Sequence, residues 1–242
     1  MLSSEYKDVD YEITNAIKNG IDKIIINGYD LKSSKEAVFL SKKYKEVYAA
    51  VGIGPENIDN VTDSDIEQIK SLAKSDKVVA IGEIGLDYYW TKDTKDNQIQ
   101  VFKSMLEIAQ NLSLPVIVHS RESINDVYNL VKEYNVVGIM HCYSGSVEMA
   151  KEFIKIGFLI GIGGVVTFKN AKKLKKVVKN IPLTSIVLET DSPYLSPEPN
   201  RGKPNNPSNL KYIVEEIAKI KNIGNDEVTN KTSENMVSKF DL

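Results

Sequence analysis

The chain has 242 residues, of which 42% are hydrophobic and 26% are charged, and this composition is typical of a globular protein rather than a disordered or fibrous one. Its formal net charge of −2 provides no overall basic field for nucleic acid or a membrane surface, so any polyanionic partner must be held by local groups. A single cysteine, Cys142, excludes an internal disulfide framework, and no apolar run reaches the roughly 20 residues of a membrane span. We therefore expect a cytoplasmic protein with no signal peptide and no membrane partner.

A helical pattern opens the chain, roughly over residues 5–20, and short apolar runs then alternate with longer helix-like segments. The apolar runs, which we expect to be strands, lie at residues 22–28, 47–53, 78–84, 115–120, 136–142, 158–163 and 185–190. Helices are expected between them, over residues 33–44, 64–75, 97–112, 123–134, 146–156 and 170–181. This alternation is typical of a parallel sheet covered by helices. Because no linker or break in composition interrupts it, we predict a single α/β domain over residues 1–242.

The number of expected strands leaves two architectures open. A (β/α)₈ TIM barrel has eight strands and begins with a strand, whereas this chain has seven apolar runs and begins with a helix. Either the sheet is open and doubly wound, or the chain forms a barrel whose first strand is missing or truncated. Under the second interpretation the run at residues 22–28 is the second barrel strand.

Four potential metal ligands lie at the C-terminal ends of expected strands. Glu83, His119 and His141 close three of the apolar runs, and Asp191 follows a fourth. Taken singly, each has an ordinary explanation: a histidine packed at a strand edge, a glutamate paired with a lysine, an aspartate that caps a turn. Together they include both histidines of the chain and share the end at which barrel enzymes carry their active sites. Imidazole and carboxylate groups suit a divalent ion such as Zn²⁺ or Mn²⁺, so we predict a metal site.

Both arginines of the chain lie close to these residues. Arg121 stands two positions after His119, and Arg201 lies in a loop, residues 193–207, that contains five of the eight prolines. The planar guanidinium group binds phosphate in a bidentate manner that lysine cannot match. Surface salt bridges are the alternative, but beside a metal cluster we favour phosphate binding.

Other features are open to two interpretations. The glycines of GIGG, residues 161–164, allow close approach of either a ligand or a neighbouring strand. Tyr88, Tyr89 and Trp90 are able to stack on nucleic-acid bases or to pack at the rim of the fold. Cys142 is expected to be a small buried filler, since no paired base marks it as a nucleophile.

Five stretches of the sequence resemble a known family. GEIGLDYY, PVIVHSRES, MHCYSGS, GGVVTFKNAKKL and LETDSPYLSPEPNRGKPNNP are similar, in order and spacing, to the successive motifs of the TatD-type metal-dependent deoxyribonucleases. The resemblance implies a (β/α)₈ barrel of the metal-dependent hydrolase type and a site for two divalent ions, Mg²⁺, Mn²⁺ or Zn²⁺. It also implies hydrolysis of DNA phosphodiester bonds, mostly as a 3′-to-5′ exonuclease that prefers single strands.

The resemblance assigns a role to each candidate residue. Glu83 corresponds to the carboxylate that bridges the two ions, and His119 and His141 to the other ligands of the second ion. Asp191 corresponds to a ligand of the first ion that also orients or deprotonates the attacking water. The resemblance also implies that Arg121, Arg201 and Lys203 bind the phosphate oxygens of the substrate.

The chain also departs from the family pattern. The His-x-His motif that ends the family's first strand is absent, and Gly54, with Glu56 close by, stands where the family carries a further histidine. A truncated reading frame explains the missing strand but not Gly54, so natural loss remains a second explanation. We expect a weakened or abolished first site and one ion held by Glu83, His119 and His141.

Two other functions remain open. One is a barrel without catalytic activity that binds nucleic acid or a phosphorylated ligand. The other is a related metal-dependent amidohydrolase or phosphoesterase. Barrel hydrolases that act on amides often bridge their ions with a modified lysine on the fourth strand, and the glutamate at position 83 favours the nuclease instead.

Overall fold

The computed structural model describes residues 2, 4, 6–89 and 94–242. Contacts between residues divide the chain into two compact units. Unit 2 contains Leu2 and the continuous segment Asp22–Ile139, and unit 1 contains the segment that ends at Ile21 together with Met140–Leu242. Unit 1 is therefore built from two stretches that are far apart in the sequence.

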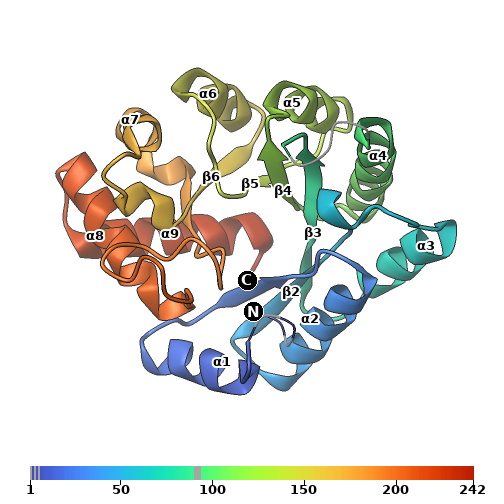
Figure 1. The fold of residues 1–242 in the computed structure, drawn as a ribbon, viewed down its shortest axis with the longest axis horizontal. Coiled ribbons are helices and arrows are strands. Elements are labelled where there is room, and N and C mark those ends of the chain that lie inside the picture. Colours follow the sequence, from blue (N-terminus) through green and yellow to red (C-terminus); the bar gives the residue numbers. More distant parts are fainter. Residues whose placement is uncertain (1, 3, 5, 90–93) are drawn as a thin grey trace. The chain divides into compact units, whose positions relative to one another are not determined.

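Unit 2 consists of parallel strands that alternate with helices, from blue to green in Figure 1. Its strands pair in chain order and are β1 (Ile24–Asn27), β2 (Val47–Val51), β3 (Val78–Asp87) and β4 (Val116–Arg121). Its helices are α2 (Leu31–Lys43), α3 (Asp63–Leu72), α4 (Lys95–Leu112) and α5 (Ile124–Glu133), with a short 3₁₀ helix η1 (Pro55–Asn57). The short strand β5 (Gly138–Met140) begins in this unit, where Val137 O accepts a hydrogen bond from Val116 N.

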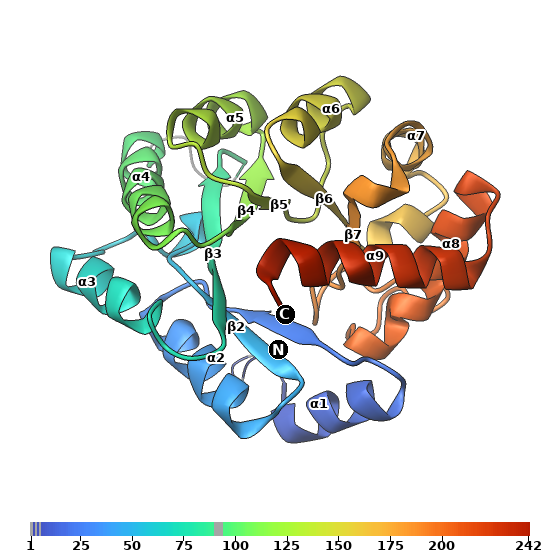
Figure 2. The same ribbon diagram turned by 180° about the vertical axis from the view of Figure 1, so that it is seen from behind.

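Unit 1 combines the first helix of the chain with the C-terminal segment Met140–Leu242. Its helices are α1 (Val9–Lys18), α6 (Val147–Lys155), α7 (Lys172–Asn180), α8 (Leu210–Lys221) and α9 (Asn225–Phe240). Its strands β6 (Phe158–Ile162) and β7 (Ile186–Leu188) are parallel, and 3₁₀ helices η2 (Gly164–Thr167), η3 (Leu183–Ser185) and η4 (Pro207–Asn209) lie around them. Figure 2 shows α9, in red, running across β7.

Contacts across a long stretch of sequence tie α1 into unit 1. The hydroxyl of Tyr6 donates to the carbonyl oxygen of Asn205 at 2.6 Å, and Asn15 Nδ2 lies 3.3 Å from Ser208 Oγ. Ile13 and Ala16, on one face of α1, are completely buried. Burial of an apolar stripe, rather than helix propensity alone, therefore stabilises this ten-residue helix.

Side-chain hydrogen bonds cap both ends of α2. Asp30 caps α2 by accepting from Ser33 N at 2.6 Å, in a reciprocal capping arrangement. At the other end of the helix, the ammonium group of Lys77 donates to the carbonyl oxygen of Ser41 at 2.6 Å and to two further carbonyls. Burial lowers the pKa of Lys77, and the three carbonyl partners are favourable for its charge at a helix C-terminus.

The structure confirms the strands and helices that were expected from the sequence. All seven apolar runs contain a strand, beginning with β1, and each expected helical segment contains a helix. β3 is longer than expected: it continues past Glu83 to Asp87, because its pairing with β4 continues to the pair Asp87 and Arg121. In the part of the chain that the structure describes, no helix combines the length and the apolar character needed to cross a membrane.

Candidate active site

In unit 2, two of the predicted metal ligands lie side by side. His119 is on β4 and pairs with Gly85 of β3, two residues beyond Glu83. The Nδ1 atom of His119 lies 3.2 Å from Glu83 Oε1. The two side chains are partly exposed, at 23% and 21%.

A third residue, Asp87, completes this group. Its Oδ2 lies 2.9 Å from His119 Nε2, and its side chain is 3% exposed. Burial by itself raises the pKa of this carboxyl, but hydrogen bonds from the His119 ring and from the backbone of Tyr89 outweigh it, and the pKa is lowered overall. Gln98 of α4 binds the backbone of Asp87 in both directions, with two hydrogen bonds of 2.8 Å. We call Glu83, His119 and Asp87 the His119 cluster.

Unit 1 contains a matching group, which we call the His141 cluster. His141 follows β5, and its Nε2 lies 3.3 Å from Oδ1 of Asp191, which follows β7. Its Nδ1 lies 2.6 Å from Oε2 of Glu189, and the other oxygen of Glu189 accepts a hydrogen bond from Cys142 N at 2.6 Å. Each cluster thus consists of a histidine, a partly exposed predicted ligand and a more buried carboxylate.

The thiol of Cys142 lies within the His141 cluster. Its sulfur, a ring nitrogen of His141 and a carboxylate oxygen of Asp191 all lie within 4.8 Å of one another. Burial, followed by the nearby charge of Glu189, raises the pKa of the Cys142 thiol well above its usual value. The thiol is therefore neutral, and Cys142 is half-buried rather than the fully buried filler that was expected.

The glycines of GIGG make room for a carboxylate rather than for a ligand. A Cβ atom at Gly161 would lie 2.8 Å from the carboxylate carbon and both oxygens of Glu189. A Cβ at Gly164 would lie 2.1 Å from the carbonyl oxygen of Leu195. The close approach expected from the sequence is thus made by neighbouring segments of the protein itself.

The predicted phosphate ligands lie on both units. In unit 2, the guanidinium carbon of Arg121 lies 3.7 Å from the centre of the Tyr89 ring. In unit 1, that of Arg201 lies 4.3 Å from the Phe168 ring, and one of its nitrogens lies 3.9 Å from Glu198. Arg201 and Lys203 are exposed in the proline-rich loop. Both arginines are therefore stacked on aromatic rings, which orients a guanidinium group.

The aromatic residues after β3 differ from one another. Tyr88 is 8% exposed, and its hydroxyl donates to Asp126 at 2.9 Å, so it packs within unit 2 and does not offer a face for stacking. Tyr89 is 51% exposed and is in contact with Arg121. Trp90, also considered for stacking, lies outside the described residues.

The donor atoms in both clusters suit a divalent ion. Two ligands of one tetrahedral ion, each bound at about 2.0–2.1 Å, lie roughly 3.4 Å apart. The distances from ring nitrogen to carboxylate oxygen, 3.2 Å in the His119 cluster and 3.3 Å in the His141 cluster, are close to this value. Near Glu83, whose N donates to Gly28 O, the buried Oδ1 of Asn27 has no hydrogen-bond partner among the described residues. Donor chemistry and spacing therefore fit a metal site.

Comparison with known proteins identifies the family. The model of the family described as TatD related DNase matches residues 2–241. The chain belongs to the TatD family. YabD of Bacillus subtilis (strain 168), an uncharacterized metal-dependent hydrolase, is 43% identical over 97% of this chain and 94% of its own length. YcfH of Escherichia coli (strain K12), also an uncharacterized metal-dependent hydrolase, is 33% identical over 99% of this chain and 91% of its own length.

A solved structure of a TatD relative confirms the fold class. The crystal structure of YjjV, a TatD homolog from Escherichia coli K12, superimposes with a TM-score of 0.92 at 28% identity and covers 98% of this chain and 93% of that chain. The hydrolase TatD family protein from Entamoeba histolytica gives a TM-score of 0.84 at 27% identity, over 98% of this chain and 90% of its own. This TatD-family chain therefore has the α/β fold of the TIM-barrel type that was expected, and it is a metal-dependent hydrolase by family.

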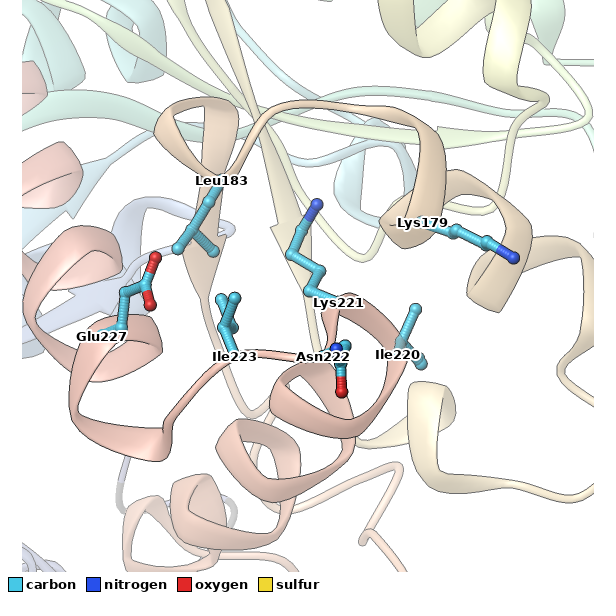
Figure 3. A pocket seen from close by; sticks show the side chains of 7 residues that line it. All are labelled: Lys179, Leu183, Ile220, Lys221, Asn222, Ile223 and Glu227. Carbon is cyan, nitrogen blue, oxygen red and sulfur yellow. The ribbon is translucent and has the colours of Figure 1, made fainter.

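A separate pocket in unit 1 is unrelated to the clusters. It has a volume of about 510 Å³ and is lined by Lys179, Leu183, Ile220, Lys221, Asn222, Ile223 and Glu227 (Figure 3). Leu183 of the pocket precedes β7, whereas the candidate metal ligand Asp191 follows β7. The pocket and Asp191 therefore lie at opposite ends of this strand. Lys221, at the centre of the pocket in Figure 3, donates a hydrogen bond of 2.8 Å to the carbonyl oxygen of Ile181. Ile181 is the C-terminal cap residue of α7, so Lys221 stabilises the end of that helix.

Two residues of the site were missed by sequence reasoning, Asp87 and Glu189. Each stands near a predicted ligand in the chain, four positions after Glu83 and two before Asp191. The signal that could have identified them is a pair of carboxylates at one strand end, Glu83 with Asp87 and Glu189 with Asp191. Metal-bound histidines commonly donate their second ring N–H to such a carboxylate.

Proposed function

We propose that this TatD-family hydrolase cleaves phosphodiester bonds of DNA, acting as a deoxyribonuclease on single strands from their 3′ ends. The observation that carries the proposal is the match of residues 2–241 to the TatD related DNase family. The donor sets of the His119 and His141 clusters support it, since histidine and carboxylate groups serve metal-assisted hydrolysis. The glutamate at position 83, where amide-cleaving relatives often use a modified lysine, favours a phosphodiester substrate over an amide.

In the proposed reaction, the candidate ligands of a divalent ion are Glu83 and His119 in unit 2, and His141 and Asp191 in unit 1. When bound, such ions make a nucleophilic water more acidic and offset the charge that develops on the phosphate. Asp191 orients the water and accepts its proton; its carboxylate is 30% exposed and therefore within reach of solvent. No covalent intermediate with the protein is required.

Arg121, Arg201 and Lys203 bind the phosphate oxygens of the substrate in this proposal. The guanidinium carbon of Arg121 lies over the Tyr89 ring at 3.7 Å from its centre, and the N–H groups of a guanidinium lie in its own plane. A stacked guanidinium is therefore compatible with bidentate phosphate binding. The exposed part of the Tyr89 ring offers a surface on which a base could also stack.

The proposal includes one tightly bound ion per chain. The candidate ligands within the given residues are Glu83, His119, His141 and Asp191, and Gly54 stands where the family carries a further histidine, so we propose a single tight site. Mg²⁺, Mn²⁺ and Zn²⁺ are all consistent with the donor set. Two tightly bound ions per chain, measured by elemental analysis after desalting, would contradict this part of the proposal.

The test is degradation of end-labelled single-stranded DNA with Mg²⁺ or Mn²⁺, and with a chelator as control. We expect metal-dependent shortening from the 3′ end that disappears in Glu83→Ala. A substrate blocked at its 3′ end separates exonuclease from endonuclease activity. If the chain binds the labelled strand but does not shorten it under any metal condition, the nuclease proposal is wrong and a binding function replaces it.

A further inference from the structure

Each of the two histidine rings lies between two carboxylates, one at each ring nitrogen, and one carboxylate of each pair is less exposed than the other. The less exposed carboxylate faces Nε2 in His119 but Nδ1 in His141. The less exposed partners are Asp87, 3% exposed, at Nε2 of His119, and Glu189, 15% exposed, at Nδ1 of His141. The more exposed partners are Glu83, 21% exposed, at Nδ1 of His119, and Asp191, 30% exposed, at Nε2 of His141.

Each of these two less exposed carboxylates is also held by a backbone N–H group. Tyr89 N donates to Asp87 Oδ1 at 2.9 Å, while Asp87 Oδ2 faces His119. Cys142 N donates to Glu189 Oε1 at 2.6 Å, while Glu189 Oε2 faces His141. A backbone N–H can only donate, so the first oxygen of each carboxylate must accept, and the carboxylate cannot turn without losing that bond.

We propose that Asp87 and Glu189 are positioning residues that fix the two histidines in opposite tautomers. Asp87 holds the proton of His119 on Nε2, and Glu189 holds the proton of His141 on Nδ1. The lone pairs then lie on Nδ1 of His119 and Nε2 of His141, the atoms that face Glu83 and Asp191. The assignment of tautomers stands on these contacts alone, whereas their use in holding a divalent ion rests on the proposed function.

The backbone bonds make isosteric amides a sharp test. In Asp87→Asn, the side-chain carbonyl oxygen must stay at the Tyr89 N–H, so the amide NH₂ group faces His119 Nε2. That nitrogen must then accept, and the proton moves to Nδ1, the atom that faces Glu83. Glu189→Gln moves the proton of His141 from Nδ1 to Nε2 in the same way, because Cys142 N holds the carbonyl oxygen.

The chain contains two histidines, so their ring nitrogens can be followed individually by NMR. In metal-free protein labelled with ¹⁵N-histidine, at a pH where both rings are neutral, we expect one ring of each tautomer. Asp87→Asn should convert His119 alone, and Glu189→Gln should convert His141 alone. The unchanged ring in each variant serves as the internal control that the chain is folded, and a merely structural role would not exchange the proton between nitrogens.

Binding of Mn²⁺ or Zn²⁺, measured by calorimetry, gives the second readout. In the cluster that holds an ion, the variant should bind it about 10- to 100-fold more weakly, the usual effect of losing the carboxylate behind a metal-bound histidine. Two rings of the same tautomer, a ring doubly protonated at every pH at which the chain is folded, or unchanged rings in both variants would overturn the inference. Correct tautomers in a wild-type chain that binds no ion would instead overturn the proposed metal site.

Discussion

Arg121 and Glu83 lie in the same unit but are expected to serve different steps. Arg121 is stacked on Tyr89 at 3.7 Å, and Glu83 lies 3.2 Å from the ring of His119. The first offers N–H donors to an anion, and the second offers carboxylate oxygens to a cation. Substitution at the two positions should therefore separate binding of substrate from binding of metal.

Glu83→Ala should remove most of the bound metal, since it deletes a ligand, and should abolish cleavage. Arg121→Ala should leave metal content unchanged and weaken binding of single-stranded DNA by about 1.5–3 kcal/mol, the contribution of a hydrogen bond to a charged group. Elemental analysis and fluorescence anisotropy measure the two quantities on the same preparations. If both variants kept full metal content and full activity, the site assignment would be wrong.

Asp126 provides a pH-dependent contribution to stability. Hydrogen bonds from Lys95 and then from the hydroxyl of Tyr88 lower the pKa of its carboxyl below the usual value. A carboxyl with a lowered folded-state pKa stabilises the fold above its unfolded-state pKa of about 3.9. This contribution is lost as the pH falls below that value through the folded-state pKa.

Urea unfolding midpoints of wild type and Asp126→Asn should therefore differ at pH 6 and converge toward pH 2 or so, because only the wild type loses a charge. Tyr88→Phe should reduce the same difference, since it removes one of the two hydrogen bonds that lower the pKa. A constant difference between wild type and Asp126→Asn across this range would contradict the role of the carboxylate charge.

At this scale the sequence predicts candidate ligands but not the groups behind them. Glu83, His119, His141 and Asp191 could be predicted because polar residues at the ends of apolar strands are conspicuous. Asp87 and Glu189 lie in the same motifs, but their partners depend on side-chain direction and on backbone N–H groups of Tyr89 and Cys142. Such contacts follow from local backbone geometry, which residue type alone does not specify.

Strands β3 and β4 are the elements that bring Glu83 and His119 together, and Gly85 allows them to do so. Gly85 has a φ of +140°, which side chains rarely adopt, and a Cβ there would lie 2.0 Å from the carbonyl oxygen of His119. Gly82, on the other side of Glu83, would place a Cβ 2.7 Å from the side chain of Ile117. The glycines around Glu83 thus permit close pairing of the two strands.

Gly85→Ala should destabilise the protein by about 1–3 kcal/mol or more, the usual cost of overpacking, and should also lower metal affinity. Gly54→Ala is the matched control, because a Cβ at Gly54 meets atoms no closer than 3.5 Å and its φ is −78°. Chemical denaturation and metal titration measure both effects. Equal behaviour of the two variants would show that the β3–β4 contact is not a constraint on the site.

The elements themselves were largely predictable, because apolar strands and amphipathic helices differ in period. The end of β3 was not: the expected strand stopped at residue 84, whereas pairing continues through Leu86 and Asp87. Polar and glycine residues in GEIGLD interrupt the apolar run, so the composition predicts that the strand ends there. Its hydrogen bonds to β4 nevertheless continue to Asp87. The GIGG glycines could be predicted to permit a close approach, but not that Glu189 makes it.

On the scale of the whole molecule, we propose that residues 1–242 form a single domain, as their uninterrupted alternation of strands and helices suggests. The proposal concerns cooperativity, since the contacts also group into two compact units. A single domain should unfold in one transition, with the calorimetric enthalpy equal to the van't Hoff enthalpy. Two separate transitions, or enthalpies that disagree, would mean that unit 1 and unit 2 unfold independently.

The discontinuous make-up of unit 1 has a consequence for biosynthesis. All of the Asp22–Ile139 segment of unit 2 is available as soon as the ribosome has released it, so its strands can pair while later residues are still being translated. The hydrogen bond from Tyr6, by contrast, cannot form until its acceptor Asn205, 199 positions downstream, has been synthesised. The nascent chain therefore carries α1 without its partners through most of its synthesis, and a pause in translation after residue 139 would lengthen that interval without delaying unit 2.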